Sequence, residues 1–116
     1  IDAVAGGSGA VIPVLPVTDT LKTVDSAGVV VGTPRRSDMV AVQTPQGFRW
    51  DVLIRAHEEG ASLGADEARA ATDDAGLVEA IGGSVQTVAG DERSMKVTRP
   101  LDLALAQILV AEETSA

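Results

Sequence analysis

A continuous apolar run, GAVIPVLPV at residues 9–17, constrains the fold more than any other feature of the chain. A run of strand length without alternating polar residues is typical of a β-strand that is covered on both faces, as in a sheet flanked by helices. Pro13 and Pro16 have no N–H to donate, so we expect the strand to lie near an edge or to leave the sheet there. An α/β fold is therefore the first expectation.

The apolar run is followed by short segments that are typical of a β-hairpin arm. TLKTV at 20–24 and GVVVG at 28–32 are separated by a three-residue turn, and MVAVQT at 39–44 follows a second turn. These segments hold few residues that can form a core of their own. We therefore expect the arm, residues 18–43, to lie against another subunit or another part of the protein.

The rest of the chain predicts helices and strands in alternation. Two amphipathic segments end at Gly60 and Gly82, SVQTVAG at 84–90 and residues 95–98 have strand character, and helical spacing resumes from Pro100. The resulting order is strand, hairpin arm, helix, helix, strand, strand, helix. This order predicts the second half of an α/β sheet with an inserted arm, and we treat residues 1–116 as part of one domain.

The first residues have the pattern of a helix end. Ile1, Val4 and Ala5 precede Gly6 and Gly7, a common glycine stop. Because a helix of about one turn is not stable alone, we expect the sequence to begin partway through a larger protein.

The net charge limits the classes of partner. A formal charge of −8 disfavours nucleic acid and an anionic membrane surface as general partners, so an anion site here must be a local cluster of cations. The absence of cysteine excludes disulfides and thiolate zinc sites and fits a reducing compartment such as the cytoplasm. No apolar stretch approaches the roughly 20 residues that span a bilayer.

Two basic segments are candidate phosphate sites. Lys96 and Arg99 precede Pro100, so they lie at a predicted helix start, where free N–H groups and the helix dipole favour an anion. Arg35 and Arg36 lie in the turn TPRRSD, and arginine suits bidentate binding of phosphate. For each segment taken alone, we favour the interpretation as a solvated basic pair over that of a phosphate site.

Three further features have a structural alternative. VQTPQGF at 42–48 ends a strand with polar groups, as ligand sites in α/β sheets do, or forms an ordinary turn. TDDA at 72–75 offers a carboxylate pair for a metal, but we favour Thr72 as an N-cap with Asp73 and Asp74 in the first helical turn. His57 has no partner motif and is expected at the surface. No complete catalytic constellation is legible.

Taken in order, five segments resemble the C-terminal half of the 2-C-methyl-D-erythritol 4-phosphate cytidylyltransferase family, an enzyme family of the non-mevalonate isoprenoid pathway. The resemblance covers residues 9–111, and the wording of GAVIPVLPVTDT and AVQTPQGF is similar to actinobacterial members. The segments are PVTDTLK (16–22), Arg36, QTPQGF (43–48), TDDA (72–75) and MKVTRPLDLALA (95–106).

The resemblance implies a Rossmann-like nucleotidyltransferase that joins methylerythritol phosphate to CTP, with Mg²⁺ assistance and loss of pyrophosphate. The family's phosphate-holding lysine and arginine correspond to Lys96 and Arg36, although Arg35 beside it leaves open which arginine reaches the phosphate. Thr20 and Thr44 are similarly placed to contact the substrate. The family's arm crosses to the partner of a homodimer, so Thr20 and Arg36 are expected to serve the partner's site.

The resemblance also implies that parts of the active site lie outside these residues. The family's glycine-rich CTP loop, its transition-state Arg and Lys, and its metal-binding aspartates belong to the N-terminal half, so this chain alone is expected to be inactive. Two alternatives remain: ribitol 5-phosphate cytidylyltransferase, which shares the fold and a TPQ-like segment, and a non-catalytic dimerisation module. The helix end at residues 1–5 argues against the second.

Overall fold

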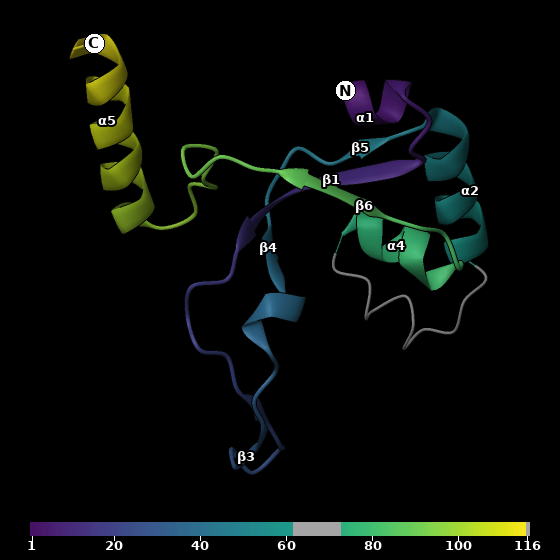
Figure 1. The fold of residues 1–116 in the computed structure, drawn as a ribbon, viewed down its shortest axis with the longest axis horizontal. Helices are drawn as coiled ribbons and strands as arrows, with labels where there is room; N and C mark the ends of the chain where they lie inside the picture. The colour runs from purple at the N-terminus through teal and green to yellow at the C-terminus, as the bar shows by residue number, and fades with distance from the viewer. Residues whose placement is uncertain (62–72, 116) are drawn as a thin grey trace. The chain divides into compact units, whose positions relative to one another are not determined.

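The computed structural model describes residues 1–61 and 73–115, and their contacts divide them into two compact units (Figure 1). Unit 1 comprises Ile1–Pro13 and Thr44–Ala89, and unit 2 comprises Val14–Gln43 and Gly90–Ala116. Strand β1, Ala10–Pro16, belongs to unit 1 in its first part and to unit 2 in its last part.

Strand β1 lies within the predicted run and pairs with three other strands. It runs antiparallel to β4, Val40–Val42, in unit 2 and antiparallel to β5, Gly47–Phe48, in unit 1. Strand β6, Gln86–Ala89, also pairs with β1 and confirms the strand predicted at 84–90. Of the two alternatives expected from its prolines, β1 does not lie at an edge, and its end at Pro16 agrees with the alternative that the chain leaves the sheet there.

The register explains how β1 accommodates Pro13. Ala10 and Val11 pair with β5, whereas the residues from Val14 to Pro16 pair with β4. Pro13 falls between these two paired segments, where its missing N–H removes none of those ladder bonds.

The core of unit 1 lies where two helices meet the first half of β1. Helix α2 spans Trp50–Gly60 and helix α4 spans Asp74–Ala80, both as the apolar spacing predicts. The two helices approach closely: a Cβ added at Gly60 would lie 3.2 Å from Leu77 Cδ2. The buried centre is Ala10, Ala56 and Val78, surrounded by Phe48, Val52, Leu77, Ile81 and Val85.

The chain begins with a short helix in unit 1. Helix α1 spans Asp2–Ala5, a single turn, and ends at Gly6 and Gly7, of which Gly7 has φ 110. The sequence-based expectation of a helix end with a glycine stop is confirmed.

The arm of unit 2 contains a two-stranded hairpin. Strands β2, Thr23–Val24, and β3, Val30–Gly32, are antiparallel and shorter than the predicted segments. Asp25 Oδ1 accepts hydrogen bonds from the N–H groups of Ala27 and Val29, both at 2.9 Å, and so closes the turn. Six valines of this region, Val24, Val29, Val30, Val31, Val40 and Val42, are exposed, as expected for an arm without its own core.

The predicted helix at Pro100 is confirmed, but the predicted strand before it is wrong. Helix α5 spans Pro100–Ser115, whereas residues 95–98 have no regular structure. No strand among the described residues pairs with this segment, and Thr98 is instead hydrogen-bonded to Asp102 of the helix. Of the helices in residues 1–61 and 73–115, none is both long and apolar enough to cross a membrane.

We predict that Val78→Ala lowers the free energy of unfolding of unit 1 by about 2 kcal/mol, because Val78 is only 1% exposed and its truncation leaves a cavity. The matched control is Val88→Ala on β6, since Val88 is 39% exposed and should change stability by about 0.5 kcal/mol or less. Urea unfolding of both variants measures the difference. Equal losses in the two variants would contradict this account of the core.

Candidate functional site

The four site residues identified from the sequence all lie at the surface. Thr20, Arg36 and Lys96 belong to unit 2, and Thr44 is the first residue of the second segment of unit 1. Among the residues that the structure describes, no recorded hydrogen bond or ion pair joins two of these four side chains. Because all four side chains are exposed, a ligand in solution can reach them.

Arg36 is held against the segment that precedes Thr20. It begins the short 3₁₀-helix η1, Arg36–Asp38, and its Nη1 donates to the carbonyl oxygen of Thr18 at 2.8 Å. A guanidinium carries five N–H donors, so this single bond leaves others for a ligand oxygen. Arg35 precedes η1 in extended conformation; its carbonyl oxygen accepts from Asp38 N at 3.1 Å, and no hydrogen bond ties its guanidinium to another described residue. Of the two arginines, the structure orients Arg36 towards the predicted substrate segment.

A hollow of about 310 Å³ lies at the base of the arm, beside this arginine contact. It is formed by the segment that leaves β1 and by the start of β4, and its apolar walls match its position next to the sheet. Its lining residues are Pro16, Val17, Thr18, Asp19, Leu21, Met39, Val40 and Ala41.

The junction at Lys96 differs from the sequence-based expectation in one respect. Asp102 Oδ2 accepts hydrogen bonds from Thr98 N at 3.1 Å, from Thr98 Oγ1 at 3.0 Å and from Arg99 N at 3.0 Å. The expectation that backbone N–H groups at this helix start are free for a phosphate is therefore wrong for these two residues, because an internal carboxylate already binds them. The Lys96 ammonium and the Arg99 guanidinium are both exposed at this junction.

The same bonds change the acidity of Asp102. Its carboxylate accepts from the Thr98 backbone, the Thr98 hydroxyl and the Arg99 backbone, and these bonds hold the pKa of Asp102 below its ordinary value of 3.8. Asp102 is thus charged at neutral pH, and the cap requires that charge.

The QTPQ segment contains two glutamines that hold neighbouring chain segments, a role that the sequence interpretation missed. Gln43 Nε2 donates to the carbonyl oxygen of Asp91 at 2.8 Å, and Gln43 Oε1 accepts from Asp91 N at 3.0 Å. In unit 1, Gln46 Nε2 donates to Asp73 Oδ2 at 2.7 Å and Gln46 Oε1 accepts from Ala75 N at 3.2 Å. Thr44 lies between these two anchored residues, and the Thr44–Pro45 peptide bond is cis.

The TDDA segment caps helix α4, one residue later than predicted. The N-cap is Asp73, whose Oδ1 accepts from Gly76 N at 2.7 Å, so the assignment of Thr72 as the cap is wrong. Thr72 itself lies outside the described residues. His57 is exposed, as predicted, and its Nε2 lies 3.0 Å from Asp74 Oδ1. Within residues 1–61 and 73–115, no group of three or more acidic or histidine side chains could hold a metal ion.

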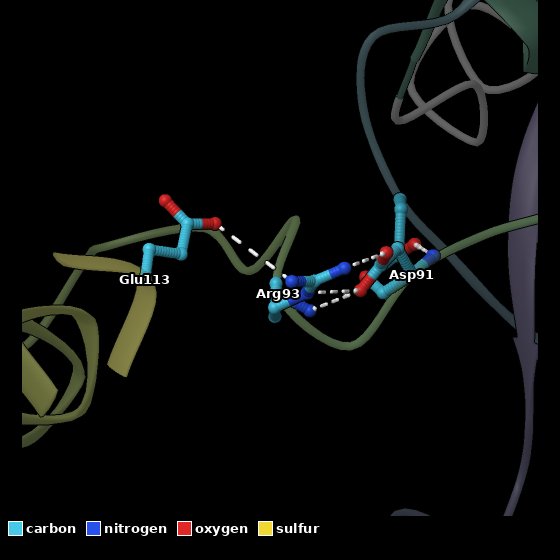
Figure 2. Close-up of polar contacts among 4 residues, drawn as sticks. Asp91, Arg93 and Glu113 are labelled. Atoms are coloured by element: carbon cyan, nitrogen blue, oxygen red, sulfur yellow. Dashed lines mark hydrogen bonds and ion pairs between the residues drawn. The ribbon is translucent and has the colours of Figure 1, made fainter. Parts of the chain in front are cut away.

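A second polar cluster, also missed from the sequence, lies between the loop after β6 and helix α5 (Figure 2). Asp91 Oδ1 accepts from Arg93 N at 2.8 Å, and the Arg93 guanidinium lies 3.3 Å from Asp91 Oδ2 and 3.8 Å from Glu113 Oε1. The side-chain hydrogen bond with Arg93 lowers the pKa of Asp91 and raises that of Arg93. Asp91 and Arg93 belong to one tight turn and Glu113 belongs to helix α5, and no periodicity in the sequence predicts this cluster.

Comparison with protein families and with characterised sequences gives a consistent result. The family model described as 2-C-methyl-D-erythritol 4-phosphate cytidylyltransferase matches residues 1–112. A protein of that name from Rhodococcus jostii is 54% identical over 106 residues, which cover 91% of this chain and 44% of the relative. The corresponding protein from Nocardia farcinica is 54% identical over 104 residues, covering 90% and 42%. The chain thus spans less than half the length of these relatives.

Solved structures agree with this match. The crystal structure of a 2-C-methyl-D-erythritol 4-phosphate cytidylyltransferase from Thermus thermophilus superposes with a TM-score of 0.71 at 39% identity, covering 92% of this chain and 50% of that one. A structure of the same name from Francisella tularensis gives a TM-score of 0.78 at 27% identity, covering 92% and 48%. The observed α/β arrangement is therefore the one that these nucleotidyltransferase structures contain.

We predict that Asp102 titrates below 3.8 in the folded chain and that its cap weakens at low pH. A carboxyl with a lowered folded-state pKa adds stability above its unfolded pKa, and this stability is lost as the pH falls through the folded value. Carboxyl NMR titration measures the pKa. Thr98→Ala removes one of the three donors, so it should move the pKa part of the way back towards 3.8. A wild-type pKa at or above 3.8 would contradict the cap.

Proposed function

This chain belongs to the 2-C-methyl-D-erythritol 4-phosphate cytidylyltransferase family, and on that basis we propose that it is part of an enzyme that couples methylerythritol phosphate to CTP. In the proposed reaction, a phosphate oxygen of methylerythritol phosphate forms a bond to the α-phosphorus of CTP. The bond from that phosphorus to the bridging oxygen breaks, and pyrophosphate leaves with the electron pair. The family match over residues 1–112 carries this proposal.

The proposed role of this chain follows from the electrostatics of the reaction. Two phosphates that repel each other must be held in line, so catalysis needs positioning and positive charge more than covalent chemistry. Lys96 and Arg36 supply such charge in a chain of net charge −8. We assign both to the phosphate of methylerythritol phosphate. The exposure of both side chains and the spare donors of Arg36 support this assignment.

We assign substrate contacts to the hydroxyls of Thr20 and Thr44 and dimerisation to the arm, residues 18–43. The proposal for Thr44 is supported by Gln46, whose hydrogen bonds to Asp73 and Ala75 hold the segment that follows Thr44 in unit 1. The proposal for the arm is supported by its exposed valines, because a homodimer would remove that apolar surface from water. In such a dimer Thr20 and Arg36 would act in the site of the partner.

We further propose that the chain corresponds to the C-terminal half of the family's domain and that CTP binding resides in the rest of the protein. A chain of 44% of a relative's length leaves room for these elements elsewhere. Within residues 1–61 and 73–115, no three carboxylate or histidine side chains come together. From the resemblance alone, we propose that the ligands of Mg²⁺ lie in the rest of the protein, and we expect residues 1–116 alone to be inactive.

We predict that Lys96→Ala or Arg36→Ala, each in the intact enzyme, lowers turnover of methylerythritol phosphate by about 10² or more, the usual cost of one lost charge contact to the transferring group. Arg35→Ala is the matched control, because it removes the same charge one residue away and should change turnover by less than about threefold. Release of pyrophosphate measures the rate.

Two outcomes of that assay would contradict the assignments. Near-wild-type rates in both Lys96→Ala and Arg36→Ala would overturn the phosphate site, and a large loss in Arg35→Ala alone would move the arginine role by one residue. Ribitol 5-phosphate serves as the second substrate: faster turnover of it than of methylerythritol phosphate would overturn the substrate assignment.

We predict that Val30→Asp shifts the intact protein from dimer to monomer by at least about tenfold in dissociation constant, because it places a charge on an apolar arm. Val30 pairs directly with Val24 across the hairpin, so the two valines present one surface. Ser26→Asp adds the same charge in the exposed turn and is the control. Sedimentation measures the equilibrium, and equal behaviour of both variants would rule out this surface as the interface.

A further inference from the structure

Lys96 lies on an irregular segment between two anchored points of unit 2. Residues 95–98 have no helix or strand to fix them, although a lysine that holds a substrate phosphate needs a defined position. The groups that hold the two ends of this segment therefore decide where its ammonium lies.

The first anchor is the backbone of Asp91, five residues before Lys96. Gln43 donates to its carbonyl oxygen at 2.8 Å and accepts from its N–H at 3.0 Å, so one side chain satisfies both backbone groups. The same carbonyl oxygen accepts from Ser94 N at 2.9 Å, which closes the turn that leads to Lys96. Gln43 thus binds backbone groups of the turn. These two hydrogen bonds do not depend on the side chain at position 91.

The residue before Asp91 shows how closely Gln43 approaches the loop. Gly90 N donates to the carbonyl oxygen of Val14 at 2.8 Å, so the loop leaves directly from beside β1. A Cβ added at Gly90 would overlap Gln43 Oε1, so the contact requires a glycine here.

The second anchor lies after Lys96. Asp102 binds Thr98 and Arg99 at the start of α5, as described above. Between the anchors, Met95 lines a hollow of about 200 Å³ together with residues of α5. No hydrogen bond between described residues holds Met95, Lys96 or Val97 directly, whereas Ser94 before them and Thr98 after them are bound.

We propose that Gln43 is a positioning residue for Lys96: by holding the backbone of Asp91 it sets the place of the ammonium at the substrate phosphate. This inference rests on the proposed function, since it takes Lys96 as the phosphate ligand. In this proposal Gln43, the first glutamine of QTPQ, acts on the substrate through Lys96, whereas its neighbour Thr44 contacts the substrate itself.

The test uses Gln43→Met in the intact enzyme, because methionine has a similar length but cannot donate to Asp91 and accepts only weakly. We expect the KM for methylerythritol phosphate to rise about tenfold while the KM for CTP stays within twofold, with a melting temperature within about 3 °C of wild type. Gln107→Met, an exposed glutamine on α5, is the matched control and should change neither KM. An unchanged KM for methylerythritol phosphate in Gln43→Met, or equal rises for both substrates, would overturn the inference.

A double-mutant cycle with Lys96→Ala separates this inference from the proposed function. If Gln43 acts through Lys96, adding Gln43→Met to Lys96→Ala should raise the KM no further, whereas independent effects would multiply. Multiplying effects would overturn the positioning role and leave the phosphate site intact. A Lys96→Ala variant with wild-type kinetics would instead overturn the phosphate site, and the positioning role with it.

Amide hydrogen exchange gives a readout that does not depend on activity. Loss of the Gln43 acceptor should speed exchange at the Asp91 amide about tenfold, with smaller increases through residue 97 and none in helix α2. Unchanged exchange at Asp91 would show that Gln43 does not hold the loop and would overturn the inference.

Discussion

The fold depends on the burial of the first half of β1 and on its pairing with three strands. Ala10, Val11 and Ile12 are buried, and the remaining part of the strand pairs with β4 at the end of the arm. The loop that leads to Lys96 starts with a hydrogen bond from Gly90 to the Val14 carbonyl, and QTPQ joins the two strands antiparallel to β1.

A second constraint is the shortage of buried apolar surface. The described core contains small side chains, and Val78 is the largest one that is almost fully enclosed. Leucines of α5 and valines of the arm are exposed instead. Contact between their apolar surface and water costs free energy, and association with further protein would remove that cost. In the proposed function, these surfaces would be covered by the rest of the enzyme and by a second copy of it. In the proposed function the phosphate site is a local one, because Lys96 and Arg36 supply positive charge in a chain whose net charge is −8.

Much of the fold was predictable because apolar periodicity depends on local spacing. The run at 9–17, the hairpin, α2, α4, β6 and α5 all follow from it. The strand expected at 95–98 did not form, since β-branched residues favour a strand only where a partner is present, and Asp102 binds Thr98 instead. The hydrogen bonds of Gln43 and Gln46 could not be predicted, because each joins residues that are far apart in the sequence. Gln43 and Asp91, for example, are 48 positions apart. The candidate site residues were identified from the resemblance of motifs. Local physical arguments alone did not distinguish them from solvated charged residues.

The central claim is that this chain supplies the substrate-phosphate side of a cytidylyltransferase. The most direct measurement is complementation: residues 1–116 are produced together with a separate N-terminal half of the Rhodococcus jostii relative, and pyrophosphate release from CTP is followed. The account predicts turnover that needs both pieces and methylerythritol phosphate, and that is lost when Lys96 is replaced by alanine. Turnover by either piece alone, or restored only by a C-terminal half of the relative, would contradict it.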